Sequence, residues 1–212
     1  MTQLSIPSFG GDMIESFLAT PAGGHGAGLI LLDGAETPPE RLSAQCEDFA
    51  AMGYLTLCPL ITQKQAPTFD HDRAVGDLLS MLAFLRKQPN CSGKVGAVGF
   101  GLGGLMAFLL AARSDVDVAV ACGSPDLTPS LGEVHDIRMP FLALCGEQTD
   151  PLKAATAARV ARSLGRNKMI AVHTYAGVDD SFFRVEHASF NAEAARDAHE
   201  KTLAFLGDQL NH

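Results

Sequence analysis

Residues 99–103 read Gly-Phe-Gly-Leu-Gly, a spacing typical of a nucleophile elbow. In such an elbow, glycines flank a Ser or Cys that is held on a sharp turn between a strand and a helix. The middle position here is Gly101, which has no side chain and cannot attack a carbonyl. The sequence therefore predicts the turn used in acyl-transfer chemistry without its nucleophile.

The backbone of this turn can still bind an anion. The N–H of Leu102 would lie at the start of a helix, where unpaired N–H groups and the helix dipole favour negative charge. An N–H from the loop around Gly34 and Ala35 would complete a notch of the oxyanion-hole type. This notch predicts a small carboxylate or ester as the ligand.

Four other side chains could supply a nucleophile or a base from a different position in the chain. Cys122 and Cys145 fall at or near the carboxyl ends of predicted parallel strands, the edge where sites gather in open α/β sheets. Ser124 follows Cys122 in a loop, and His187 lies further along the chain. The plainer interpretation, which we favour, makes the cysteines small buried hydrophobes and His187 a helix-start or surface residue.

Strands and helices that alternate along the chain must position these residues. Apolar runs bounded by Gly, Pro and Asp predict strands over residues 4–9, 13–20, 28–32, 54–59, 95–98, 116–122, 141–145 and 169–175. Helical spacing or propensity predicts helices over residues 40–52, 70–88, 105–112, 152–164 and 191–210, with loops over 61–69 and 123–139. The first two strands are expected to form a β-hairpin or to be two edge strands, and the later alternation predicts a mostly parallel sheet with helices on both faces.

Residues 28–210 resemble the dienelactone hydrolase family. The resemblance rests on Val-Gly-Ala-Val-Gly-Phe-Gly-Leu-Gly-Gly at 95–104, Met-Pro-Phe-Leu-Ala-Leu-Cys-Gly at 139–146, and Tyr-Ala-Gly-Val-Asp-Asp-Ser-Phe at 175–182. It implies an α/β-hydrolase fold with a mostly parallel sheet of about 7–8 strands. It also implies a Cys–Asp–His triad that hydrolyses enol-lactones or related small esters through an acyl-enzyme, with no cofactor.

Carried onto this chain, the nucleophile position of the family is Gly101, the acid position is Asp150 and the histidine position is Asp180. Two of the three roles are therefore vacant. A carboxylate with an ordinary pKa of about 3.9 is a poor substitute for an imidazole near 6.5. The family also has a Glu soon after the strand that corresponds to residues 28–32. In an alignment without gaps, the residue at this position is Gly34.

We interpret the triad as degraded and the chain as a hydrolase-family protein that is not active by that mechanism. The alternatives are a non-catalytic small-ligand-binding or interaction protein, and a divergent hydrolase with a relocated nucleophile such as Cys122 or Ser124. Asp150 and Asp180 are expected to approach each other and could together hold a cation, although a helix-capping role for Asp150 is the favoured interpretation.

Composition limits the remaining possibilities. A chain of 212 residues with 47% hydrophobic content predicts one domain over residues 1–212. A net charge of −8 argues against nucleic acid or an anionic membrane as a partner, and the apolar runs are too short to span a bilayer. Five irregularly spaced cysteines, with no metal-binding pair, predict a cytoplasmic protein without a metal. We expect a monomer or homodimer.

Overall fold

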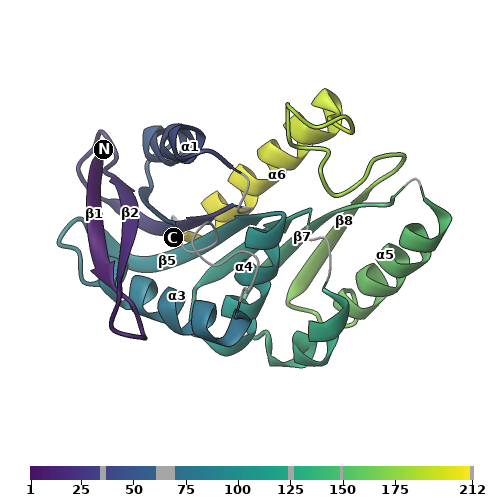
Figure 1. The fold of residues 1–212 in the computed structure, drawn as a ribbon, viewed down its shortest axis with the longest axis horizontal. Helices are drawn as coiled ribbons and strands as arrows, with labels where there is room; N and C mark the ends of the chain where they lie inside the picture. Colours follow the sequence, from purple (N-terminus) through teal and green to yellow (C-terminus); the bar gives the residue numbers. More distant parts are fainter. Residues whose placement is uncertain (34–36, 61–69, 124–126, 149, 211–212) are drawn as a thin grey trace.

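The computed structural model describes residues 1–33, 37–60, 70–123, 127–148 and 150–210. Its centre is an eight-stranded sheet in the order β1-β2-β4-β3-β5-β6-β7-β8 (Figure 1). The strands are β1 Thr2–Pro7, β2 Met13–Ala19, β3 Gly26–Leu32, β4 Leu55–Pro59, β5 Cys91–Phe100, β6 Val118–Cys122, β7 Phe141–Gly146 and β8 Ile170–Tyr175. β1 and β2 form the predicted antiparallel hairpin, and β3 to β8 run parallel to one another. The predicted fold class and strand positions are confirmed.

Helices cover both faces of the sheet. They are α1 Pro39–Ala51, α3 His71–Arg86, α4 Leu102–Arg113, α5 Pro151–Leu164 and α6 Ala192–Leu210. In Figure 1, α1 and α6 lie above the sheet, and α3, α4 and α5 lie below it. No helix in the described ranges is long and apolar enough to cross a membrane.

The two faces explain the apolar run of β3. Successive side chains of a strand point to opposite faces, so a strand covered on both sides must be apolar at every position. Leu29 and Leu31 belong to the core shared with α1 and α6, whereas Ile30 and Leu32 belong to the core shared with α3 and α4. β3 therefore lies in the middle of the sheet. Asp33, which directly follows it, lies at the edge of the sheet formed by the carboxyl ends of the strands.

Several predicted bounds differ from the structure; β5, for example, covers Cys91–Phe100 rather than residues 95–98. The predicted loop 123–139 contains a 3₁₀ helix, η1 Thr128–Asp136, whose first turn includes a proline with a backbone angle already suited to a helix start. Helix α4 begins at Leu102 rather than at residue 105, so Gly103 and Gly104 belong to the helix. The predicted loop 61–69 lies outside the described residues.

Candidate functional site

The elbow between β5 and α4 has the strained backbone that the sequence predicts. Gly101 has φ 57° and ψ −121°, and its N–H donates to the carbonyl oxygen of Cys122 at 2.9 Å. A residue with a Cβ in such a conformation costs about 1–3 kcal/mol, which glycine avoids. The turn of a nucleophile elbow is therefore present, with no side chain at its tip.

The flanking glycines have a different role, which is close packing. A Cβ on Gly99 would lie 2.0 Å from the carbonyl oxygen of Gly103, and a Cβ on Gly103 would lie 2.3 Å from the carbonyl oxygen of Leu32. Both distances are far shorter than any real carbon–oxygen contact. Helix α4 can therefore begin tightly against β3 and β5 only because these positions lack side chains.

An arginine approaches the tip of the elbow. The Nη2 atom of Arg184 lies 3.3 Å from the point where a Cβ on Gly101 would be. The same nitrogen lies 3.5 Å from Oδ1 of Asp33, whose side chain is 4% exposed. The guanidinium also lies 5.8 Å from the ring centroid of Phe183. A positive group thus occupies the neighbourhood in which a nucleophile's side chain would begin.

Arg184 and Asp33 were not among the site residues predicted from the sequence. Asp33 carried a usable signal, since it directly follows the buried central strand β3, where binding groups of open α/β sheets gather. Arg184 carried none, because only the tertiary fold brings it to Gly101. The N–H of Leu102 lies at the start of α4, as predicted, while Gly34 and Ala35 lie outside the described residues.

Asp180, where the family resemblance implies a histidine, is held by hydrogen bonds from the loop after β7. Its Oδ1 accepts from the N–H of Gly146 at 3.2 Å, and its Oδ2 accepts from Nε2 of Gln148 at 2.6 Å. Gln148 has φ 67°, and it is the one non-glycine residue with a positive φ in the described part of the chain. Such strain persists only where the surrounding structure enforces it. The loop therefore fixes the Asp180 carboxyl in place.

The protonation of Asp180 differs from the expectation. Burial raises the pKa of its carboxyl to about 6, with a further upward contribution from Asp179, against downward contributions from the two hydrogen bonds. The ordinary Asp value near 3.9, which made Asp180 a poor base, does not apply at this position. Its pKa instead approaches that of an imidazole.

Asp150 lies in a different environment. Its carboxylate is exposed and caps α5, accepting from the N–H groups of Leu152 and Lys153 at 3.0 Å each. The capping role is confirmed. Asp150 and Asp180 share no hydrogen-bonding partner among the described residues, and no cluster of three or more His, Cys, Asp or Glu side chains there could hold a metal ion.

A cavity of about 560 Å³ adjoins Asp180. Its lining includes Cys145, Gln148, Lys153 and His187. The structure therefore brings together Asp180 and two of the alternative residues, Cys145 and His187. Neither Gly101 nor Asp150 lines this cavity.

The buried thiols are poorly suited to nucleophilic attack. Burial, with a smaller contribution from the nearby Asp180, raises the pKa of Cys145 to about 12. Burial also raises the pKa of Cys122 well above its ordinary value. A thiol must ionise to attack, so both groups are inert near neutral pH. Ser124 lies outside the described residues, and His187 is exposed, with Nδ1 in hydrogen-bond contact with Ser189.

The strand order, the crossing helices and the elbow define an α/β-hydrolase fold. The sequence profile of the dienelactone hydrolase family matches residues 14–210, and the chain belongs to this family.

Individual relatives agree with that assignment. A carboxymethylenebutenolidase of Pseudomonas putida is 29% identical over 223 residues, which cover 96% of this chain and 94% of the relative. A second carboxymethylenebutenolidase, from another Pseudomonas, is 25% identical over 96% of this chain and 93% of its own. The crystal structure of dienelactone hydrolase from Anabaena variabilis has a TM-score of 0.76 and 18% identity, covering 99% of this chain and 97% of the other.

Proposed function

We propose that this chain keeps the family's pocket as a binding site for a small carboxylate or ester and does not hydrolyse through a Cys–Asp–His triad. The observation that carries the proposal is the elbow itself. Its tip is Gly101, and a guanidinium nitrogen of Arg184 lies 3.3 Å from the missing Cβ position. Attack on a carbonyl needs a nucleophile within about 3–3.5 Å, and neither residue supplies one.

The same arrangement suits an anion. The first N–H groups of α4 have no acceptor within their helix, and the dipole of α4 favours negative charge at Leu102. Arg184 adds a full positive charge and a planar set of donors that matches a carboxylate. Asp33 already lies 3.5 Å from this guanidinium, so a ligand carboxylate would share or replace that ion pair.

The alternative of a divergent hydrolase with a relocated nucleophile receives less support. Cys145 lies beside Asp180 in a sizeable cavity, but its raised pKa keeps the thiol protonated. A cytoplasmic location and a monomeric or homodimeric state remain predictions, supported by the five free cysteines and by the acidic composition.

Binding and turnover measured on the same protein test the proposal. Titration of ¹⁵N-labelled protein with butyrate should give saturable shifts of the Leu102 and Gly103 amides, and p-nitrophenyl butyrate should not be hydrolysed above the buffer rate. Arg184→Met should weaken butyrate binding by about tenfold, since a charged hydrogen-bonded pair contributes roughly 1.5–3 kcal/mol. Arg166→Met, which removes the same charge from an exposed position, should not.

Two results would overturn this function. One is saturable ester turnover that is lost in Cys145→Ala, which would establish a relocated nucleophile. The other is butyrate binding that is equally strong in the Arg184→Met protein, which would place the anion elsewhere.

A further inference from the structure

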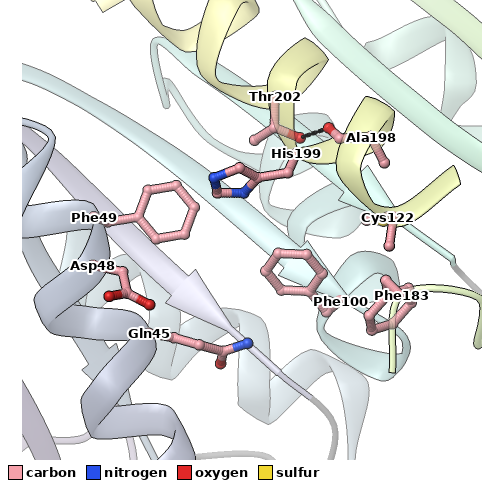
Figure 2. A pocket seen from close by; sticks show the side chains of 10 residues that line it. Gln45, Asp48, Phe49, Phe100, Cys122, Phe183, Ala198, His199 and Thr202 are labelled. Carbon is pink, nitrogen blue, oxygen red and sulfur yellow. Dashed lines mark hydrogen bonds between the residues drawn. The ribbon is translucent and has the colours of Figure 1, made fainter. Parts of the chain in front are cut away.

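A second cavity, of about 200 Å³, opens between α1 and α6 on the face of the sheet opposite α4 (Figure 2). Its floor includes Phe100 at the end of β5 and Cys122 at the end of β6. Neither Gly101, Arg184 nor Asp180 lines it. It is therefore separate from the anion notch and from the cavity beside Asp180.

Aromatic rings line two sides of this cavity. Phe49 of α1 faces His199 of α6 with ring centroids 6.3 Å apart, and Phe100 faces Phe183 at 5.3 Å (Figure 2). The volume suits a ligand with one aromatic ring, and the surrounding rings favour edge-to-face or offset contacts with it. Aromatic faces also attract a cation within about 6 Å of the ring centroid.

Among the described residues, the cavity lining contains one carboxylate and no Lys or Arg, and the guanidinium of Arg184 lies 5.8 Å from the ring centroid of Phe183. Asp48 is exposed where it lines the cavity, and its carboxylate has no ion pair among the described residues. The titratable groups that line the cavity are Asp48, His199 and Cys122, and burial keeps the Cys122 thiol neutral. The net charge of −8 adds a weak, long-range attraction for cations.

We propose that the cavity between α1 and α6 binds a small primary arylalkylammonium cation. The aromatic ring lies among Phe49, Phe100 and Phe183. The ammonium group donates to the carboxylate of Asp48. A neutral ligand of the same shape lacks the charge that Asp48 selects, and a carboxylate ligand is repelled by it.

Benzylamine is the probe that tests this site, with benzyl alcohol and phenylacetate as matched comparisons. At pH 7, a ¹⁵N titration should show saturable shifts of the Phe49 and His199 amides, which line the cavity from α1 and α6, with benzylamine. Benzyl alcohol should bind about tenfold more weakly, and phenylacetate should not shift these amides in a saturable way. Equal affinity for the amine and the alcohol, or no saturable shift with benzylamine, overturns the proposal.

Variants separate the charge from the fold. Asp48→Asn should weaken benzylamine about fivefold or more and leave benzyl alcohol unchanged. Glu47→Gln removes the same charge from the preceding residue of α1, which is exposed and does not line the cavity. This variant should leave both affinities unchanged. Equal effects of the Asp48 and Glu47 variants overturn the site.

Discussion

A guanidinium nitrogen of Arg184 lies 3.3 Å from the point where a Cβ on Gly101 would be. This single relationship separates two properties that an α/β-hydrolase elbow normally combines. The backbone keeps the strained turn that opens a helix toward the pocket, while the charge that now lies beside it favours binding of an anion. The proposed loss of the nucleophile would therefore be compatible with the proposed ligand site.

Restoring a nucleophile and a base together should create hydrolysis. Gly101→Cys places a thiol on the elbow, and Asp180→His places an imidazole at the family's histidine position. A positioned general base contributes about 10²–10⁴-fold, so the double variant should hydrolyse p-nitrophenyl acetate about a hundredfold faster than either single variant. Release of p-nitrophenol measures the rate.

Mass spectrometry supplies the control for this gain. The double variant should carry an acyl adduct at position 101 during turnover, and the Asp180→His protein should carry none there. A double variant that folds but is no faster than Gly101→Cys alone would mean that Asp180 does not occupy the position of a base.

The glycine after the elbow should be indispensable for packing. In Gly103→Ala, the new Cβ would lie 2.3 Å from the carbonyl oxygen of Leu32, and backbone on both sides must move. We expect a loss of about 3 kcal/mol in the free energy of unfolding, at the upper end for overpacking. Gly132→Ala is the matched control, since its Cβ would meet open space, and it should change stability by less than about 0.5 kcal/mol. Urea unfolding compares the two.

The strands of the sheet could be predicted from the sequence because each one has its own local pattern of residues. Buried strands covered on both faces, such as β3 and β6, are short apolar runs bounded by turn residues. The first turn of α4 was missed because Gly103 and Gly104 are poor helix formers, and their place in the helix is explained by contacts with β3 and β5.

The site could be predicted only in part, because some of its residues belong to contiguous motifs and others are brought together only by the tertiary fold. Motif spacing predicted Gly101 and Asp180 as site positions, since these positions belong to contiguous stretches. The approach of Arg184 to Gly101 depends on the tertiary fold. The raised pKa of Asp180 depends on burial by loops whose positions cannot be predicted from the sequence. The sequence alone therefore supported only the ordinary pKa of an Asp carboxyl.

Asp180 should make stability depend on pH. Its folded-state pKa of about 6 exceeds the ordinary value near 3.9, so the folded protein retains a proton that the unfolded chain releases between about pH 4 and 6. The stability from this proton is fully present below about pH 4 and is lost as pH rises through 6. Asp180→Asn cannot ionise, so its stability relative to wild type should improve by roughly 1–3 kcal/mol from pH 4.5 to pH 7.5.

Urea unfolding at each pH checks the size and sign of this effect. Asp208→Asn, which removes a carboxylate from the exposed side of α6, is the matched control and should follow the wild-type profile. An Asp180→Asn curve parallel to wild type would contradict the assignment of the raised pKa to this carboxyl.

The turn between β1 and β2 should depend on one buried carboxylate of α3. Oδ1 of Asp77, which is 1% exposed, accepts from the N–H of Phe9 at 2.8 Å, and the Phe9 ring lies over Gly76. Asp77→Ala leaves the Phe9 N–H without its acceptor and should cost about 1–3 kcal/mol in the free energy of unfolding. Asp77→Asn keeps an oxygen for that N–H and should lose less than half as much. Equal losses in urea unfolding would show that the charge, rather than this hydrogen bond, secures the turn.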